Sequence, residues 1–429
     1  MPTNAVESIN ELFPWKVCIN LDRRADRWRR MHERFQRHEI RGVRRFSALD
    51  GAQLRPPPQW RFSAGAYGCL LSHVQVVREA RARGMSRVFV LEDDVIFPEN
   101  FQARFNLCIT QLPADWDMVF FGVLHLEDPI GVADNVVRIR KAYSTYAYAL
   151  NHTAFDDFLA LNSSAENPLD KNHFGLQARF NCYCFTPHLA WVEADYSDAQ
   201  QRLENHWYLR YSLVLFGDSI NRLLAATTVV IAYCNDSGDD SSEQNLLYLL
   251  QYYYEFFAGY LAVIVVEQGD KSSLDPRALP ANCRYLRAAH KGPFDPQRCF
   301  RQAVAERDGQ MQYFIFSDSD IFLEPMDIRA NLRMCEHYDA ATGFGRLFAL
   351  FALSVEDTLW LHKNKNTRGL NLGGYCAADN NRHCCCIVGN RALEALASNT
   401  SLLPLEKNSA QLSVFESPNH ALRLHSGGR

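Results

Sequence analysis

The sequence predicts an α/β protein built from two Rossmann-like domains in tandem. Short apolar runs rich in Val, Ile and Phe alternate with longer segments that place apolar residues at helical spacing. This alternation runs through the first half and starts again near residue 226. In each half, one apolar run ends in a cluster of acids. Such alternation is typical of a mostly parallel sheet covered by helices, in which ligands bind at the carboxyl ends of strands.

The first half contains predicted strands separated by helices. The helix at 25–38 carries Trp28, Met31 and Phe35 at helical spacing, and the helix at 66–84 ends at Gly84, a common helix terminator. A third helix is expected at 97–113. The predicted strands lie at 17–21, 44–51, 88–95 and 116–122.

The second half repeats the strand–helix order. A polar loop and an apolar helix at 245–260 follow its first strand, and a further helix is expected at 297–309. The predicted strands are 226–235, 261–270, the segment CRYLRAA and YFIFSDSD. We place the boundary between residues 213 and 225, which gives domains 1–218 and 219–429 in a chain of 429 residues.

Composition excludes some classes of protein. The net charge of -4 gives no reason to expect a nucleic-acid partner, and no apolar run is long enough for a transmembrane helix. The segment 22–45 is rich in arginine; it is either a solvated helix face or a basic rim for phosphates, and it is a candidate for peripheral contact with anionic lipid.

The 13 cysteines, with three adjacent at 384–386 beside an apolar run typical of a buried strand, favour thiols in a reducing cytoplasm. A zinc site there with His383 is disfavoured because no second ligand pair accompanies it.

Acids at the ends of apolar strands suggest bound cations. In 88-VFVLEDDVIF-97, Glu92, Asp93 and Asp94 follow the strand directly, and their mutual repulsion would grow on burial. Divalent cations are the usual remedy, because hard cations prefer carboxylate oxygens. In 313-YFIFSDSDIFLEP-325, Asp318 and Asp320 have the same placement, and strand alternation puts both on one side, with Ser319 pointing away.

The first half resembles glycosyltransferase family 25, the group of lipooligosaccharide and collagen galactosyltransferases. The resemblance spans about residues 15–210. It is carried, in order, by INLDRRADRWRRM, RRFSALDG, AGAYGCLLSH, FVLEDDV, CFTPHLAW and YSDAQQR. It implies a GT-A-like fold that binds a nucleotide sugar. One departure is Ala66, where many members have Glu.

By this resemblance, Glu92, Asp93 and Asp94 line the metal and diphosphate site, with Asp94 also a candidate catalytic acid. Near the end of the first strand lie further donor-binding candidates, namely Asn20, Asp22, Arg23 and Arg27. For Asn20 and Asp22 the alternative is that they cap the following helix. Ser72 and His73 are donor-binding candidates too, although a helical His is often a packed, hydrogen-bonded residue.

Asp198 is the preferred later acid and a candidate catalytic residue. Its alternative role is to cap a helix over AQQRLENHW. Asp115, Asp117 and Asp170 are further candidates, with a surface turn as the alternative for Asp170.

The second half resembles, more loosely, a family 2-like GT-A glycosyltransferase. The similar features are TVVIAYCN, AVIVVEQGD and the DxD of FIFSDSDIFLEP. The resemblance implies metal binding by Asp318 and Asp320, completed by His425, and donor contacts from Asp318; we expect Glu267 and Asp270 to meet the nucleotide. The candidate catalytic base is Asp379, with Glu356 and Asp357 as alternatives.

Together these features predict a cytoplasmic, bifunctional glycosyltransferase with two GT-A-like domains. It would use Mn²⁺ or Mg²⁺ and UDP-sugars, with UDP-galactose as the expected first donor, to extend a glycan such as lipopolysaccharide or capsule. Two alternatives remain open. In the first, only one domain is an active transferase and the other is a glycan- or donor-binding module. In the second, the protein is a metal-dependent nucleotidyltransferase.

Overall fold

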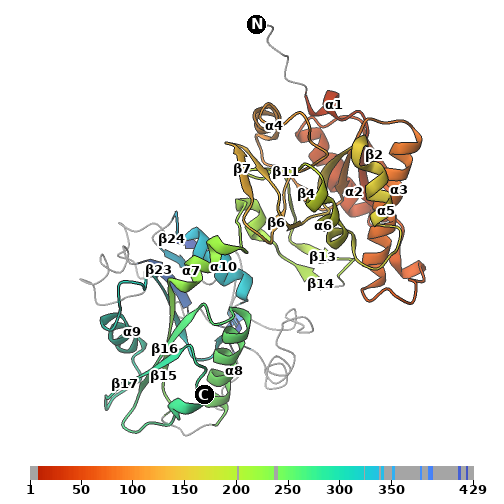
Figure 1. The fold of residues 1–429 in the computed structure, drawn as a ribbon. Helices are drawn as coiled ribbons and strands as arrows, with labels where there is room; N and C mark the ends of the chain where they lie inside the picture. Colours follow the sequence, from red (N-terminus) through yellow and green to blue (C-terminus); the bar gives the residue numbers. More distant parts are fainter. Residues whose placement is uncertain are drawn as a thin grey trace. The chain divides into compact units, whose positions relative to one another are not determined.

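The chain contains two compact units, Met1–Gly217 and Asp218–Arg429, hereafter unit 1 and unit 2. The computed structural model describes residues 8–200, 202–235, 240–322, 324–337, 340–342, 350–352, 377–378, 385–389, 414–416 and 422–423. Each unit has its own central sheet (Figure 1). The family assignment of each domain is not tested by this division and stays a prediction.

Unit 1 is built on an eight-stranded mixed sheet. The first three strands are parallel: β1 (Lys16–Asn20) lies between β2 (Val43–Ser47) and β3 (Arg87–Glu92). Beyond β3 the sheet continues with β10 (Ala147–Asn151), β5 (Met118–Phe120), β11 (Cys182–Phe185), β8 (Val136–Arg138) and β7 (Ile130–Ala133). The sheet is mixed, since β10 and β8 run antiparallel to their neighbours, but β5 and β11 run in the same direction as β1, β2 and β3, so most of the strands are parallel as expected.

Three short two-stranded pairings complete unit 1. They join β4 (Val95–Ile96) to β12 (Trp191–Val192), β6 (Leu124–His125) to β9 (Ala142–Tyr143), and β13 (Asp195–Ser197) to β14 (Arg202–Glu204). The β13–β14 hairpin lies where the sequence allowed a helix beginning at Asp198, so that capping role for Asp198 is wrong.

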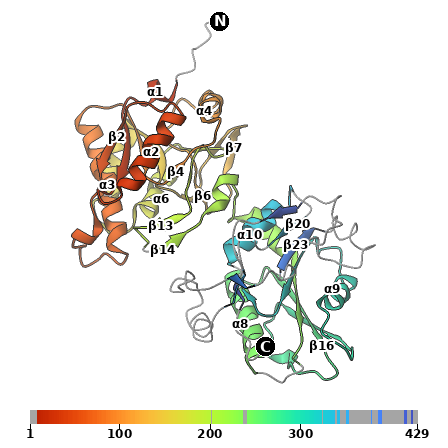
Figure 2. The same ribbon diagram turned by 180° about the vertical axis from the view of Figure 1, so that it is seen from behind.

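Helices cover both faces of the unit 1 sheet. On one face, α3 (Ala64–Ala82), α5 (Phe155–Leu161) and α6 (Leu169–Arg179) pack on apolar strand residues such as Val88 and Val90. On the other face, an aromatic cluster joins Phe13, Phe89, Phe101 and Phe121. Here lie α1 (Ile9–Leu12), α4 (Phe101–Ile109) and α2 (Ala25–Arg37). Figures 1 and 2 show α3 and α4 on opposite sides of the unit.

The helices that carry site residues form for reasons that can be read from nearby residues. Helix α3 begins after Ser63, whose hydroxyl accepts a hydrogen bond from Ala66 N, and it buries Leu70, Val74 and Val77. Helix α2 buries Met31 and Phe35 at helical spacing. Helix α4 is shorter than the expected 97–113, beginning at Phe101 after Pro98.

Unit 2 has a seven-stranded sheet. Its parallel part places β15 (Thr227–Tyr233) between β16 (Ala262–Gln268) and β18 (Tyr313–Asp318), with β17 (Cys283–Ala288) beside β16. On the other side of β18 follow β23 (Cys385–Gly389), β20 (Ala340–Thr342) and β24 (Val414–Glu416). The strand expected at the adjacent cysteines is confirmed as β23. A smaller sheet contains β19 (Ile321–Phe322), β25 (Leu422–Arg423), β21 (Leu350–Ala352) and β22 (Ala377–Ala378).

The described helices of unit 2 are α7 (Asp218–Ala225), α8 (Asp240–Phe256), α9 (Pro296–Ala305) and α10 (Pro325–Met334). Helix α9 packs Phe300 and Ala303 on the sheet. Both ribbon views show α8 and α9 on opposite sides of the sheet (Figures 1 and 2). Within the described residues, no helix has the length and apolar character to cross a membrane.

Candidate functional site

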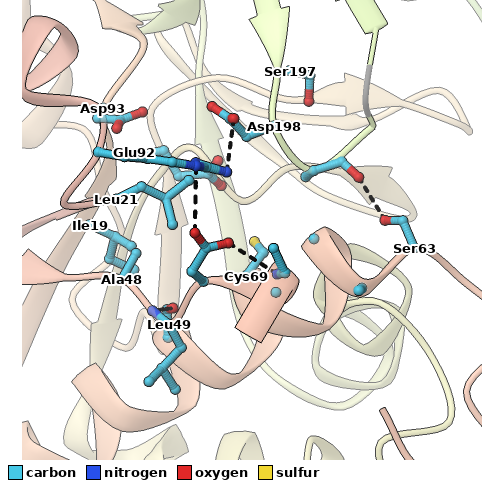
Figure 3. A pocket seen from close by; sticks show the side chains of 18 of the residues that line it. Ile19, Leu21, Ala48, Leu49, Ser63, Cys69, Glu92, Asp93, Ser197 and Asp198 are labelled. Atoms are coloured by element: carbon cyan, nitrogen blue, oxygen red, sulfur yellow. Dashed lines mark hydrogen bonds and ion pairs between the residues drawn. The ribbon is translucent and has the colours of Figure 1, made fainter. Parts of the chain in front are cut away.

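A cavity of about 410 Å³ opens in unit 1 at the carboxyl ends of β1, β2 and β3 (Figure 3). It therefore lies where the strand order changes direction, the usual ligand position in such sheets. Eight predicted site residues line it: Arg23, Arg27, Ser72, His73, Glu92, Asp93, Asp94 and Asp198. Figure 3 shows Glu92, Asp93 and Asp198 above Leu49 and Cys69 in that view.

The three adjacent acids have different partners. Both carboxylate oxygens of Asp93 are engaged, Oδ1 by Arg27 at 2.9 Å and Oδ2 by Asn20 Nδ2 at 2.6 Å. In contrast, Asp94 Oδ1 and Glu92 Oε1 are buried without a hydrogen-bond partner. The nearest basic groups are distant for hydrogen bonds, since Arg27 Nη1 lies 3.5 Å from Asp94 Oδ2 and His73 Nε2 lies 3.5 Å from Glu92 Oε1.

Burial changes the acidity of this cluster. It raises the pKa of Asp94 to about 7, and the charges of Glu92 and Asp93 add to the rise. Burial also raises the pKa of Asp93, although Arg27 and Asn20 oppose the effect. For Glu92 the burial cost is outweighed by interaction with His73, so the pKa of Glu92 is lowered. Asp94 is thus the acid whose charge is least well compensated.

A fully buried histidine lies beside these acids. His73 Nδ1 is 3.0 Å from Tyr148 Oη, and the two rings stack with centroids 5.8 Å apart. The ligand atoms of Cys69, His73 and Glu92 lie within 4.8 Å of one another. His73 is therefore a packed, hydrogen-bonded residue that also lines the cavity, and its contact with a donor stays a prediction.

A row of arginines joins α2 to the segment 193–198. Arg27 is buried and donates to Tyr196 O at 2.7 Å as well as to Asp93. Farther along the helix, Arg30 and Arg34 both bind Glu193, at 3.0 and 2.8 Å. The alternative of a wholly solvated helix face is therefore wrong for these arginines. Their charges are already paired, and contact with lipid through segment 22–45 stays a prediction.

Asp198 is held by two further arginines. Arg23 Nη2 lies 3.0 Å from Asp198 Oδ1, and Arg24 Nη1 lies 2.6 Å from Oδ2. Ser63 Oγ donates to Ala199 O at 2.6 Å, which fixes the same turn against the start of α3 (Figure 3). Asp198 therefore lines the cavity as part of an ion-pair network.

Asn20 and Asp22 do not cap α2, so that alternative is wrong. The N-cap of α2 is Arg24, which has no side-chain cap, and Asn20 Nδ2 instead donates to Arg24 O. Asn20 orients Asp93 from behind the cavity wall. The Asp22 carboxylate accepts from Arg45 and Ser47 at 2.8 and 2.6 Å and is not among the lining residues.

Close backbone packing shapes the opposite wall. A Cβ on Gly68 would lie 2.3 Å from Leu49 O, and one on Gly65 would lie 2.7 Å from Asp198 O. Ser72 Oγ accepts from Leu49 N and donates to Gly68 O, so this hydroxyl fixes the loop in addition to lining the cavity. Sequence reasoning missed the glycines and Ser63 as site residues. The signal was present, because AGAYGCLLSH contains Gly65 and Gly68.

The other candidate acids of unit 1 lie outside the lining. Asp117 precedes β5, which runs in the direction of β3, so Asp117 lies at the opposite edge of the sheet. Its carboxylate accepts from Thr153 and from Asn181 N, and Asp115 accepts from Asn181. Asp170 is in the first turn of α6, where burial raises its pKa.

In unit 2, the parallel strands bring two predicted residues to one edge. Asp318 at the end of β18 pairs in register with Ala232, and Glu267 near the end of β16 pairs with Tyr233. Asp318 and Asp320 are half-buried around the β18–β19 turn. Glu267 accepts hydrogen bonds from Ser272, Ser273 and Tyr285, so it fixes the loop after β16. Asp270 is paired with Lys291 at 3.5 Å. The predicted residues Asp379, His425, Glu356 and Asp357 lie outside the described residues.

A Rossmann-like unit with strand-end acids, buried arginine and a lined cavity is typical of enzymes that bind a phosphate-bearing ligand with a divalent cation. Residues 15–126 match the family model described as Glycosyltransferase family 25 (LPS biosynthesis protein). The N-terminal region is therefore similar to glycosyltransferase family 25, which confirms that predicted resemblance for these residues. The resemblance of the second half to family 2 stays a prediction.

Two curated relatives illustrate the match. The chain is 33% identical over 162 residues to the Homo sapiens protein named Inactive glycosyltransferase 25 family member 3, covering 32% of this chain and 27% of that protein. It is 30% identical over 158 residues to Procollagen galactosyltransferase 2 of Mus musculus, covering 31% and 25%. The chain thus spans about a quarter of the length of these relatives, which include a protein named inactive.

Solved structures give weaker likenesses. Glucosyl-3-phosphoglycerate synthase from Mycobacterium tuberculosis, in complex with Mn²⁺, UDP and phosphoglyceric acid, has a TM-score of 0.25 at 15% identity. The match covers 41% of this chain and 62% of that one. A 4-diphosphocytidyl-2C-methyl-D-erythritol synthase from Anaerococcus prevotii has a TM-score of 0.29 at 9% identity, covering 46% and 89%. TM-scores of this size carry no functional argument.

Proposed function

We propose that unit 1 is a hexosyltransferase that moves a sugar from a nucleotide-sugar donor to a glycan acceptor in this cavity. The observation that carries the proposal is the juxtaposition of Glu92, Asp93 and Asp94 with Arg27 inside the cavity. The family 25 segment includes all four of these residues. A sugar donor of this class leaves a nucleoside diphosphate, so the site needs positive charge where the leaving group forms.

The residues fit a divalent cation. Asp94 Oδ1 and Glu92 Oε1 are buried oxygens without hydrogen-bond partners, and burial together with the charges of Glu92 and Asp93 raises the pKa of Asp94. Asp94 and Glu92 are thus the residues that would hold Mn²⁺ or Mg²⁺, with Asp93 adjacent but already bound to Arg27 and Asn20. The cation would supply positive charge for the departing diphosphate.

The other lining residues have roles that follow from their contacts. Arg27 pairs with Asp93, which opposes the rise in the pKa of Asp93 that burial causes, and adds fixed positive charge to the site. His73 lies 3.5 Å from Glu92 and is itself held by Tyr148. Arg23 lies at the cavity, 44% exposed, where it can meet a phosphate if its pairs with Asp198 and Asp50 open. Asp198 therefore orients Arg23 and Arg24, and we assign it a positioning role in place of the catalytic one.

The finer parts of the proposal rest on sequence features and on the resemblance, and not on the geometry of the cavity. They are UDP-galactose as donor, a lipopolysaccharide, capsule or collagen-type acceptor, a cytoplasmic location, and a second transferase in unit 2. For unit 2, the supporting feature is that Asp318 and Asp320 follow a central parallel strand.

The test measures UDP release by the full chain from a panel of UDP-sugars, with a glycan acceptor mixture, in Mn²⁺ and in chelator. We expect release that depends on the cation and falls at least about 100-fold in Asp94→Asn, the scale for losing one group that stabilises transition-state charge. Asp134→Asn, an exposed acid outside the lining, is the matched control and should be unaffected.

Two outcomes would overturn the proposal. One is sugar transfer that survives both chelator and Asp94→Asn. The other is pyrophosphate release from a nucleoside triphosphate in place of UDP release, which would identify a nucleotidyltransferase. If calorimetry shows donor binding but no sugar is transferred to any acceptor, unit 1 is a binding module.

A further inference from the structure

A second cluster of metal-ligand side chains is buried in unit 1, and none of its members lines the cavity. It consists of His125 at the end of β6, Cys184 on β11, and His188 in the loop after β11. The ligand atoms of the three residues lie within 4.8 Å of one another, and all three side chains are buried. Cys184 forms no disulfide.

His188 is oriented as a metal ligand would be. Its Nδ1 lies 2.8 Å from Leu209 O. Because a carbonyl oxygen only accepts, Nδ1 carries the hydrogen, and Nε2 keeps its lone pair in the neutral ring. Burial lowers the pKa of His188 to about 4, so the neutral form is the one present at pH 7. A ring nitrogen held by a backbone carbonyl is the usual outer contact of a ligating histidine.

The cluster also contains polar atoms with no partner. His125 is 3% exposed, and its Nδ1 has no hydrogen bond; burial, with the neighbouring His188, lowers its pKa to about 3. The Tyr146 hydroxyl is buried and has no partner either. Tyr146 and His188 flank the same glycine, since a Cβ on Gly122 would lie 2.5 Å from Tyr146 Oη and 3.3 Å from His188 Cγ. Unpaired buried polar groups lose their hydrogen bonds to water without replacement, so an occupant that binds them is favoured.

We propose that His125, Cys184 and His188 form a site for a zinc-class transition-metal ion, separate from the sugar-transfer cavity. Two imidazoles and a thiolate are the ligands that zinc prefers. Around a tetrahedral zinc ion, bond lengths of about 2.0–2.3 Å put ligand atoms roughly 3.3–3.7 Å apart. The three side chains therefore need to close by no more than about 1.5 Å, and the fourth position is left for Tyr146 or water.

Binding has a defined proton balance. Burial raises the pKa of the Cys184 thiol, so the site without metal holds a neutral S–H. Metal binding replaces that proton with a metal–sulfur bond and releases it to solvent, while both imidazoles bind through lone pairs they already have. No oxidation or reduction takes place.

The ion would join three segments that are distant in sequence. These are β6, the β11 strand with its following loop, and the 3-10 helix Trp207–Tyr211 that contains Leu209. His188 N also donates to Ser212 Oγ at 2.7 Å. We therefore expect a stabilising effect on unit 1 and no direct part in catalysis.

The test uses the purified full chain, stripped with chelator and then titrated with Zn²⁺ and with Co²⁺. We expect one Zn²⁺ per chain by mass spectrometry, a rise in Tm, and with Co²⁺ a thiolate-to-cobalt charge-transfer band. Cys184→Ser should remove that band. The matched control is Cys182→Ser, because Cys182 is also fully buried on β11, two residues away. Cys69→Ser is the second control, since Cys69 lies by the acidic site, and both controls should keep the band.

The proposal is overturned if wild-type protein shows no thiolate–cobalt band, or if the band is lost in Cys69→Ser and kept in Cys184→Ser. If Cys184→Ser does not fold, His125→Asn and His188→Asn replace it. Each should weaken zinc affinity by about 10- to 100-fold or more, as loss of a ligand or its support does. Unchanged affinity in both would mean that the cluster holds water.

Discussion

Asp94 combines a fully buried carboxylate oxygen with an incompletely compensated charge. Burial raises its pKa, two neighbouring carboxylates add to the rise, and Arg27, which opposes it, also serves Asp93. A carboxyl group with a folded pKa near 7 and an unfolded value of about 3.9 binds its proton more tightly in the folded state. Its contribution to stability is complete below about pH 4 and is lost as the pH rises to about 7.

We therefore predict that Asp94→Asn is stabilising in metal-free protein, and more so at pH 8 than at pH 5. Asparagine resembles the protonated acid and has no charge to bury. The measurement is the free energy of urea unfolding of both proteins at the two pH values, in chelator. Added Mn²⁺ should then stabilise the wild type and not the variant. An equal difference at both pH values would show that Asp94 is not the titrating group.

Arg27 is the buried cation on which the acid cluster depends. We predict that Arg27→Ala destabilises unit 1 by about 3–5 kcal/mol, because it leaves Asp93 as an unpaired buried charge. The matched control is Arg29→Ala on the exposed side of the same helix, which should change stability by about 0.5 kcal/mol or less. Chemical denaturation of both variants checks the prediction, and similar values for the two would contradict it.

At the scale of elements, the start of α3 determines the shape of the cavity. Gly68 lets the helix approach the loop at Leu49 so closely that no other residue fits. We predict that Gly68→Ala costs about 1–3 kcal/mol in stability and also weakens donor binding, because the cavity wall must move.

Gly175→Ala on α6 is the control for this substitution. Its Cβ would meet only the movable side chain of Leu161, at 3.1 Å, and alanine favours the helix by up to about 1 kcal/mol. Thermal unfolding and equilibrium binding of UDP to both variants would test the pair. Equal effects of the two substitutions would mean that the close contact between Gly68 and Leu49 does not determine the stability of unit 1 or the shape of the cavity.

Local sequence patterns predicted α2, α3 and the parallel strands because apolar spacing and helix signals are properties of neighbouring residues. They failed at Asp198, where Ser197–Asp198 is a good helix start but the chain forms the β13–β14 hairpin. Ion pairs with Arg23 and Arg24, more than 170 residues away in sequence, hold that turn. Partners at such distances are not visible in one segment. The same reason explains why the strands between 124 and 151 were missed.

At the scale of the whole molecule, two α/β units each carry acids at a strand end. We predict that Asp320→Asn removes turnover of one donor and leaves the donor lost in Asp94→Asn unaffected. The physical reason is that each acid cluster ends a strand of a separate sheet. The measurement is UDP release by the full chain and both variants across the donor panel. Loss of every activity in Asp94→Asn alone would leave unit 2 without a transferase role.

Sequence reasoning identified the strand-end acids of both units because their positions follow from strand patterns alone. It did not distinguish their roles. Asp93, Asp94 and Glu92 are adjacent in sequence, yet only the folded structure shows Asp93 bound on both oxygens and Asp94 Oδ1 unpaired. Likewise, Glu267 follows the predicted pattern for a nucleotide contact but is used to hold Ser272 and Ser273.

The segment 193–198 forms part of the cavity wall and is held to α2 largely by charge pairs with Arg23, Arg24, Arg30 and Arg34. These pairs are partly exposed, so concentrated salt weakens them, because the Debye length falls from about 8 Å at physiological ionic strength to about 3 Å at 1 M. The apolar core of the unit does not weaken in this way. The cavity should therefore loosen in concentrated salt while the protein remains folded, so we expect ionic strength to change ligand affinity separately from stability.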